Sequence, residues 1–466
     1  MAFKKDFVFG VASAAYQIEG AYNEGGRGES VWDRYSHTPG NILHGHTGDV
    51  ACDHYHRYKE DVALMASLGI KAYRFSISWS RLIPDGAGEL NPEGVKFYSD
   101  LIDELLKNGI EPYVTLFHWD YPTALFDKGG WLNQECILWF AKYAEKVVSL
   151  YSDRVKYFIT FNEPQCFIGQ GYEQGIHAPG LKLPFDQVLQ IAHNVMKAHG
   201  AAVIAMRKAA KQQIKIGYAP TCSASYPKND TPEDIEAARR AFFACPEING
   251  GAMWNVSWWS DPVILGKYPE DGLRLYRDYL PKITEEDMRL ISQPIDFYAQ
   301  NIYNGHAVEA AEDGAYKFFK REAGYAQTAI GWPVTPEALC WGPRFLYERY
   351  RLPIVISENG MADTDWVSLD GGVHDPARID FITRYVSALR KAADCGVDID
   401  AYFYWSFTDN FEWTKGYTAR FGLVYVDYAT QKRIVKDSGY WYSNLIKEQK
   451  NRRNKQKANI SLQITV

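Results

Sequence analysis

Eight strand-like segments alternate with helical patterns along this chain, and no other feature restricts its fold as strongly. Each segment is a short apolar run, and residues 157–161 (Tyr-Phe-Ile-Thr-Phe) are an example. Strands that alternate with helices without a break form a parallel sheet, and eight repeats predict closure into a barrel. The predicted strands lie near residues 7–14, 73–79, 112–118, 157–161, 214–219, 297–303, 353–357 and 399–405.

Two of the intervening helices are defined by their end signals and apolar stripes. Asn91-Pro92 predicts an N-cap followed by proline in the first turn, and Gly109 predicts the end of the same helix. A second apolar stripe runs through residues 188–195 at helical spacing. His199 continues that stripe, and we expect it to be a partly buried histidine with a hydrogen-bond partner rather than a ligand.

The pattern indicates one catalytic domain, a single α/β (β/α)8 barrel of the TIM type with long βα loops, over residues 1–449. A barrel of this kind accommodates most of the 466 residues without a linker. An open sheet that binds a dinucleotide needs a glycine-rich turn after a strand, and Gly25–Gly28 follows no strand directly. Residues 450–466 are polar and basic, and we expect a solvated tail.

Charge and cysteine usage exclude several classes of function. A net charge of -6 argues against nucleic-acid binding, and the longest aromatic-apolar stretch, residues 401–407, is too short to span a membrane. The seven cysteines are widely spaced and form no C-x-x-C pair, which is typical of reduced thiols. Because the first residues also lack the apolar core of a signal peptide, we expect a cytoplasmic protein. The sequence leaves a homo-oligomer open.

Two glutamates follow predicted strands, each beside an asparagine. Glu163 lies in Thr-Phe-Asn-Glu-Pro and Glu358 in Ile-Ser-Glu-Asn-Gly. A single glutamate at a strand end is usually solvated or a capping residue. Two carboxylates delivered to the same rim of a barrel are able to supply the acid and the nucleophile for cleavage of a glycosidic bond.

Sugar chemistry also requires hydrogen-bond partners for hydroxyl groups and apolar faces for pyranose rings. Polar and aromatic residues at other strand ends fit this need, although most of the chain's aromatic residues must belong to the core. These candidates are Gln17, Glu19, His118, Asn162, Asn301, Tyr303, Trp405, Glu412 and Trp413.

The sequence contains no convincing motif for a metal site, for phosphate binding or for a serine nucleophile. His44-x-His46 and His54-x-His56 each lack a third ligand, and the second pair begins a predicted helix, where residues two apart do not face each other. The chain has no P-loop and no G-x-S-x-G motif.

The chain resembles the glycoside hydrolases of family 1, the β-glucosidase type, from Phe7 to about Lys447. The matching motifs occur in the family order. They are Gln17–Gly20, Arg74–Arg81, His118–Asp120, Thr160–Pro164, His177–Gly180, Asn301–Tyr303, Gly331–Trp332, Glu358–Gly360 and Asp409–Trp413.

The resemblance implies retaining hydrolysis of a β-linked glycoside on a (β/α)8 barrel, without cofactor or metal. It assigns Glu358 as nucleophile and Glu163 as acid/base, with Arg74 and Tyr303 holding the nucleophile ionised and oriented. Asn162 is expected at the sugar 2-hydroxyl. The implied substrate-binding residues are Gln17, His118, Trp119, Asn162, Asn301, Trp332 (aglycone platform), Trp405 (stacking floor), Glu412, Trp413 and Phe421.

Lys415 complicates the specificity. Family members specific for 6-phosphorylated sugars carry serine in place of Glu412, with lysine and tyrosine shortly after it. Here Glu412 and Trp413 are present. Because a buried carboxylate repels a phosphate group, the sequence favours an unphosphorylated glycone. We expect a β-glucosidase with some activity on β-galactosides and β-fucosides. A 6-phospho-β-glycosidase, a transglycosidase that uses the same intermediate, and a non-catalytic sugar-binding barrel are the alternatives.

Overall fold

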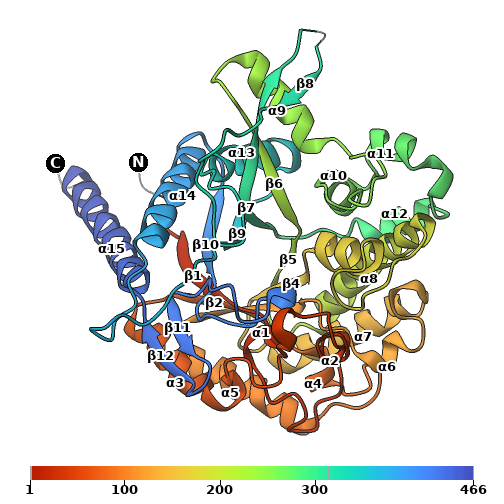
Figure 1. Ribbon diagram of the computed structural model, residues 1–466, viewed down its shortest axis with the longest axis horizontal. Coiled ribbons are helices and arrows are strands. Elements are labelled where there is room, and N and C mark those ends of the chain that lie inside the picture. The colour runs from red at the N-terminus through yellow and green to blue at the C-terminus, as the bar shows by residue number, and fades with distance from the viewer. Residues whose placement is uncertain (1–2, 313, 465–466) are drawn as a thin grey trace.

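The predicted barrel is confirmed, and parallel pairing closes it. The computed structural model describes residues 3–312 and 314–464. Within these residues eight strands pair in parallel around the barrel, and the β5–β7 and β1–β10 pairs complete the ring (Figure 1). They are β1 (Val8–Ala12), β2 (Ala72–Ser76), β3 (Glu111–Phe117), β4 (Tyr157–Asn162), β5 (Lys215–Ala219), β7 (Phe297–Ala310), β9 (Ile354–Asn359) and β10 (Ile399–Trp405).

Strand alternation divides the core into two layers. In β4, Ile159 belongs to a small buried cluster to which most barrel strands contribute, whereas its neighbour Phe158 belongs to the large outer cluster. Successive side chains of a strand point to opposite faces, so the first set fills the barrel and the second packs against the helices. Tyr113 and Phe403 are other members of the inner cluster, with ring centroids 4.8 Å apart.

Helix α5 (Pro92–Lys107) shows how local sequence defines the outer layer. The Asn91 side chain accepts a hydrogen bond from the Glu93 N–H, and Pro92 occupies the first turn, as predicted. Gly109 adopts φ +68° just beyond the helix, a conformation that glycine reaches without strain. The other long helices of the barrel are α3 (His54–Ser67), α7 (Cys136–Tyr151), α8 (Phe185–Ala209), α13 (Ala338–Tyr350) and α14 (Pro376–Asp394), and α12 (Glu285–Ile291) is a shorter helix.

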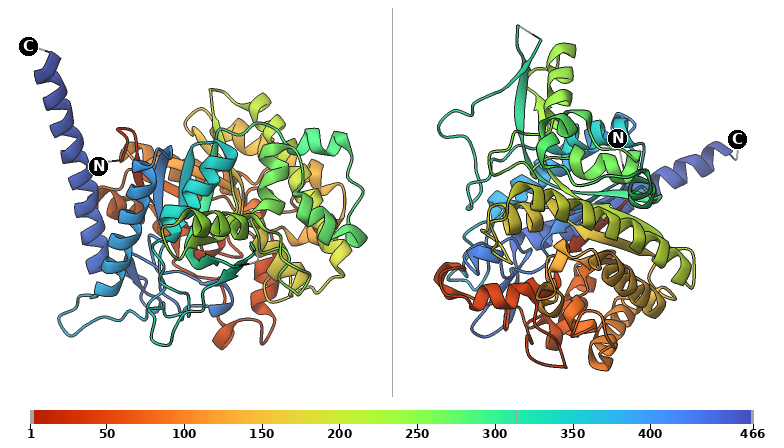
Figure 2. Two further views of the ribbon diagram at one scale, coloured as in Figure 1. Left: turned by 90° about the horizontal axis from the view of Figure 1, so that it is seen from above. Right: turned by 90° about the vertical axis from the view of Figure 1, so that its right-hand side faces the viewer.

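Extensions beyond the barrel were not predicted. Strand β7 continues past the rim and forms an antiparallel hairpin with β8 (Tyr316–Phe318), while β6 (Thr221–Pro227) pairs in parallel on its other side. This hairpin and α9 (Pro232–Phe243) project from the barrel (Figures 1 and 2). The shorter elements are α1 (Ala15–Ile18), α2 (Val31–His37), α4 (Trp79–Leu82), α6 (Thr123–Phe126), α10 (Ser257–Ser260), α11 (Glu270–Leu275), β11 (Val424–Asp427) and β12 (Lys432–Val435).

The C-terminal segment forms one long helix, α15 (Asp437–Ile464), whose end extends away from the barrel (Figure 2). Residues 450–464 of the predicted tail continue this helix, and residues 465 and 466 lie outside the described part of the chain. The domain boundary at residue 449 stays a prediction. None of the described helices is long and apolar enough to cross a membrane.

Candidate active site

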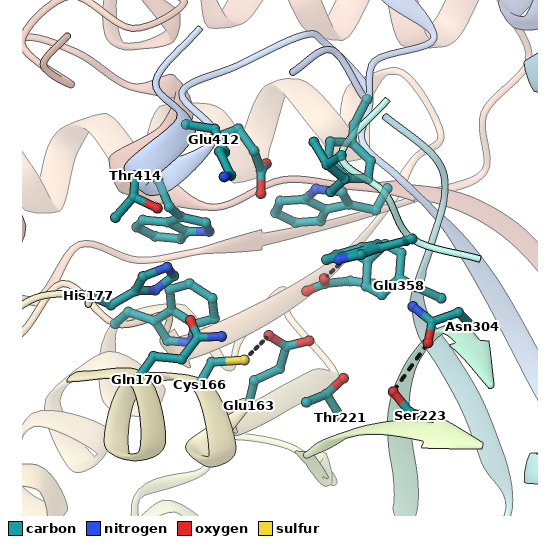
Figure 3. Close-up of a pocket in the computed structure, with 18 of the residues that line it drawn as sticks. Glu163, Cys166, Gln170, His177, Thr221, Ser223, Asn304, Glu358, Glu412 and Thr414 are labelled. Atoms are coloured by element: carbon teal, nitrogen blue, oxygen red, sulfur yellow. Dashed lines mark hydrogen bonds between the residues drawn. The ribbon is translucent and has the colours of Figure 1, made fainter. Parts of the chain in front are cut away.

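A pocket of about 460 Å³ opens where the barrel strands end, and both predicted catalytic glutamates line it (Figure 3). The predicted residues that line it are His118, Trp119, Glu163, Tyr303, Trp332, Glu358, Trp405, Glu412, Trp413 and Phe421. The remaining predicted residues, Gln17, Arg74, Asn162 and Asn301, are buried beside it and hydrogen-bonded to lining side chains. The structure therefore brings these residues together from segments far apart in sequence.

Glu358, near the end of β9, is held by two donors. Arg74 Nη1 donates to its Oε1 at 2.7 Å, and the Tyr303 hydroxyl donates to its Oε2 at 2.7 Å. Arg74 Nη2 also donates to Asn162 Oδ1 at 2.5 Å. Both donors favour the charged form of the Glu358 carboxyl and orient it, which leaves a fixed carboxylate facing the pocket.

Glu163 directly follows β4 and is held by a different pair of donors. Asn301 Nδ2 donates to Oε1 at 2.8 Å, and the Cys166 thiol donates to Oε2 at 3.2 Å (Figure 3). Neither donor is charged, so each stabilises the Glu163 carboxylate less than Arg74 stabilises Glu358. The backbone φ of Glu163 is +45°, a left-handed conformation that costs a non-glycine residue on the order of 1–3 kcal/mol.

Three carboxyl groups share this pocket and influence one another. Burial raises the pKa of Glu163, Glu358 and Glu412 above the ordinary glutamate value. Arg74 opposes the rise in the pKa of Glu358, whereas the neighbouring Glu163 charge adds to it. Since the strongest cationic donor contacts Glu358, we expect this carboxyl to lose its proton first and Glu163 to keep its own.

Asn162 connects the acidic groups with His118. The Asn162 Nδ2 atom lies 3.1 Å from His118 Nε2, and because an amide NH₂ only donates, Nε2 must accept and the ring proton lies on Nδ1. Burial lowers the pKa of His118, so the ring is neutral. His118 Nδ1 has no protein partner in the described structure, and the same holds for Gln17 Oε1. These two atoms remain free for hydroxyl groups of a ligand.

Aromatic rings form the walls of the pocket. Trp413 packs against Trp119 with ring centroids 4.3 Å apart, and His118 stacks on Trp405 at 5.7 Å. Trp332 lies beside Phe421 and Tyr303, with ring centroids 6.0 and 5.1 Å away. Flat apolar faces beside polar groups suit a pyranose ring, which has C–H faces and a polar edge.

The backbone around the pocket is held in unusual conformations. Trp119 has φ +80° and Trp413 has φ +45°, both in the left-handed region that bulky residues rarely adopt. Gly360 follows Glu358-Asn359, and a Cβ there would lie 1.8 Å from the Trp405 carbonyl oxygen. Only glycine allows β9 to pass this close to β10, so the Glu-Asn-Gly motif has a packing reason.

Glu19 has other surroundings than the sequence suggested, and the contacts of Lys415 and two histidines are now defined. Glu19 is buried and bonded to Arg81 at 2.8 Å and Tyr98 at 2.6 Å, which is a structural role. Lys415 lines the pocket and makes no ion pair within the described residues. His46 Nδ1 accepts a hydrogen bond from the backbone of Tyr417. His199 bonds Thr160 and is fully rather than partly buried.

Several lining residues were not singled out from the sequence. Ser223 and Asn304 hydrogen-bond to each other at 3.2 Å on the wall next to Glu163 (Figure 3). Cys166, from the segment after Glu163, also lines the pocket and was not singled out. Asn304 directly follows the Asn-Ile-Tyr strand motif, and no sequence pattern indicated that its side chain lines the pocket.

Comparisons with known proteins show the family of the chain. A model of glycosyl hydrolase family 1 matches residues 1–451. Beta-glucosidase A of Thermotoga maritima is 45% identical, covering 96% of this chain and 98% of that protein, and Beta-glucosidase A of Acetivibrio thermocellus gives the same three values. A solved family 1 β-glucosidase from Thermotoga maritima superposes with a TM-score of 0.87 at 44% identity, over 96% of this chain and 98% of that one. The same enzyme has been solved with deoxynojirimycin.

Proposed function

The chain belongs to glycosyl hydrolase family 1, and from this premise we propose that it is a β-glucosidase that acts on small β-glucosides and oligosaccharides. It removes the terminal non-reducing sugar and retains the anomeric configuration. The β-glucosidase names of relatives at 45% identity over nearly the whole chain support the glycone. Activity on β-galactosides and β-fucosides belongs to the same proposal.

One observation carries the assignment of roles, namely the different donors of the two glutamates. Glu358 is held by a guanidinium and a phenol, whereas Glu163 is held by an amide and a thiol. The first environment suits a carboxylate that attacks as a nucleophile. The second suits a carboxyl that must gain and lose a proton during each turnover.

In the first step, Glu358 attacks the anomeric carbon as the bond from that carbon to the leaving oxygen breaks. Glu163 transfers its proton to the same oxygen, so the aglycone leaves as a neutral alcohol. The products of this step are a glycosyl ester on Glu358 and an ionised Glu163.

In the second step, the Glu163 carboxylate takes a proton from a water molecule whose oxygen attacks the anomeric carbon. The ester bond breaks, Glu358 becomes a carboxylate again and Glu163 regains its proton. Two inversions at one carbon give net retention. At the beginning and the end of the cycle Glu358 is a carboxylate, and the hydrogen bonds from Arg74 and Tyr303 stabilise its negative charge.

The free polar atoms of the pocket support recognition of an unphosphorylated sugar. His118 Nδ1 supplies a donor and Gln17 Oε1 an acceptor, and Glu412 lies within 3.5 Å of Gln17 Nε2. Burial and the two catalytic carboxyls raise the pKa of Glu412 above the ordinary glutamate value, and its carboxyl oxygens are available to the hydroxyl groups of a sugar. Trp405 and Trp413 supply the ring faces.

The cysteines bear on the cellular location of the protein. All seven cysteines lie in the described residues and are free thiols, which agrees with a reduced environment. The cytoplasmic location and a homo-oligomer both stay predictions.

Initial rates on three p-nitrophenyl substrates test the proposal, with β-glucoside, β-galactoside and 6-phospho-β-glucoside at one enzyme concentration. We expect the β-glucoside to be cleaved fastest. Preference for the phosphorylated substrate would mean that Lys415 dominates over Glu412, and the lysine variant Lys415→Met would then lose that preference. Absence of activity on all three would refute the glycosidase assignment.

A further inference from the structure

We propose that Lys436 is a positioning residue that holds residues 409–413, here called the glycone loop, in the conformation that binds the sugar. Glu412 and Trp413 end this loop and line the active-site pocket, and the Glu412 carboxyl points into it (Figure 3). Lys436 directly precedes α15, and it is not among the described residues that line the pocket. This inference rests on the proposed function, in which Glu412 and Trp413 recognise the glycone.

The Lys436 ammonium group joins two carboxylates whose side chains are buried. Its Nζ donates to Asp409 Oδ1 at 2.6 Å and to Asp365 Oδ2 at 2.5 Å. Asp409 is the first residue of the glycone loop, and Asp365 lies in the segment between β9 and α14. Because β9 carries Glu358, Lys436 ties the glycone loop to the segment that follows the proposed nucleophile.

Asp409 extends this restraint to a second segment of the pocket wall. Its Oδ1 also accepts a hydrogen bond from the Gly422 N–H at 2.9 Å, and its Oδ2 accepts one from Arg420 Nη1 at 2.6 Å. These two donors flank Phe421, which lines the pocket. A Cβ at Gly422 would lie 2.1 Å from the Asp409 backbone nitrogen, so the two segments are in close contact. One carboxylate therefore fixes the glycone loop and Phe421 relative to each other.

The glycone loop requires restraint at both of its ends, because its backbone is in an unfavourable conformation. Trp413 has φ +45°, in the left-handed region that a bulky side chain disfavours. Gln17 Nε2 restrains the later part of the loop, since it donates to the Phe411 carbonyl at 2.9 Å and to Glu412 Oε2 at 3.5 Å. Asp409 restrains the beginning. Loss of a donor to Asp409 therefore allows Glu412 and Trp413 to move out of place.

Charge balance separates this role of Lys436 from simple packing. Six ion-paired groups form a buried chain in the order Asp375, Arg378, Asp365, Lys436, Asp409 and Arg420. Negative and positive groups alternate along this chain, and their formal charges sum to zero. Removal of the Lys436 charge alone leaves one buried negative charge unbalanced, whereas removal of the Asp365 charge with it does not.

Inhibition by deoxynojirimycin tests the inference, because this sugar-shaped inhibitor has no aglycone. We would measure its inhibition constant with the parent protein and with Lys436→Met, which removes the ammonium group and keeps most of the apolar side chain. We expect the constant to rise about tenfold, the effect of one lost charge-assisted hydrogen bond. KM for p-nitrophenyl β-glucoside should rise with it. An inhibition constant does not depend on the folded fraction, so lower stability alone leaves it unchanged.

Two further variants separate positioning from charge balance. Asp365→Asn removes one charge but keeps an oxygen that can accept from Lys436, so it is the matched control and should keep the parent inhibition constant. The double variant Lys436→Met with Asp365→Asn removes one charge of each sign and restores the balance. We expect this double variant to have a higher Tm than Lys436→Met and to keep the raised inhibition constant, because Asp409 lacks its lysine donor in both.

The outcomes distinguish this inference from the proposed function. No activity on p-nitrophenyl β-glucoside in the parent refutes both. Normal parent activity with the parent inhibition constant in Lys436→Met or in the double variant refutes the positioning role alone, as does an equal rise in Asp365→Asn. If Lys436→Met does not fold, the double variant decides. Failure of the double variant to fold would show that Lys436 serves stability, and it would overturn the inference as well.

Discussion

The Tyr303 hydroxyl donates a 2.7 Å hydrogen bond to Glu358 Oε2, and this contact joins the side chains of two adjacent barrel strands, β7 and β9. A phenol can stabilise the carboxylate here only by donating, since burial and the Glu358 charge raise the pKa of Tyr303 well above its usual value. The bond therefore links the geometry of the barrel to the ionisation of the proposed nucleophile.

Tyr303→Phe should shift the acidic limb of the activity profile to higher pH. Loss of the donor destabilises the Glu358 carboxylate, so the pKa of Glu358 rises and a higher pH is needed to ionise it. We expect a shift of about one pH unit in kcat/KM. Tyr402→Phe is the control, because it removes a buried hydroxyl that donates to Asn359 and not to Glu358. This variant should leave the acidic limb of the kcat/KM profile at the parent pH. An unchanged limb in Tyr303→Phe would contradict the role given to this residue.

Glu163→Ala should discriminate between leaving groups. Substrates with poor leaving groups need the proton of Glu163, and we expect them to lose about 10³-fold or more in kcat/KM. A 2,4-dinitrophenyl glucoside, whose leaving group needs no proton, should retain most of its kcat/KM. Added azide should raise kcat on the activated substrate and yield β-glucosyl azide. Equal losses on every aglycone would argue against the acid/base assignment.

Glu358→Gly should abolish hydrolysis and permit synthesis. Removal of the attacking carboxylate should lower turnover by about 10⁴-fold or more. The vacated space accepts α-glucosyl fluoride, a mimic of the intermediate, and sugar transfer to an acceptor should follow. Product formation is measured by mass spectrometry. Glu19→Gln, which changes a buried glutamate outside the pocket, is the control and should form no product from the fluoride.

Asp120→Asn should stabilise the protein at alkaline pH. Burial raises the pKa of Asp120 to about 8, above the unfolded value, so the folded state holds a proton that the unfolded chain releases. This difference lowers the stability as the pH rises from about 4 to about 8. The asparagine lacks the ionisation, so we expect a Tm higher by about 2–5 °C at pH 8 and little difference at pH 4. An equal change in Tm at both pH values would contradict this account.

Much of the barrel was predictable because local and global preferences agree. Residues 157–161 favour a strand by composition, alternate between the two core layers from Tyr157 to Ile159, and lie between two helical stripes. The same agreement placed Asn91 at the beginning of α5. Motif spacing then predicted which strand ends carry polar groups, and their meeting at one rim follows from parallel pairing.

The unpredicted parts depend on non-local contacts. Strand β6 begins two residues after β5, mixes small polar and apolar residues, and is a strand because β7 continues beyond the rim to pair with it. The left-handed conformations of Trp119, Glu163 and Trp413 oppose local preference and are imposed by the surrounding site. Asn304 was missed for the same reason, since its partner Ser223 belongs to that unpredicted strand.

Trapping of the intermediate tests the central claim most directly. We would incubate the protein with a 2-deoxy-2-fluoro-β-glucosyl substrate that carries an activated leaving group, digest it and identify the labelled peptide by mass spectrometry. The account predicts one fluoroglucosyl group per chain, attached to Glu358, and none on Glu163. A label on another carboxylate, or rapid turnover of this substrate by Glu358→Gly, would contradict it.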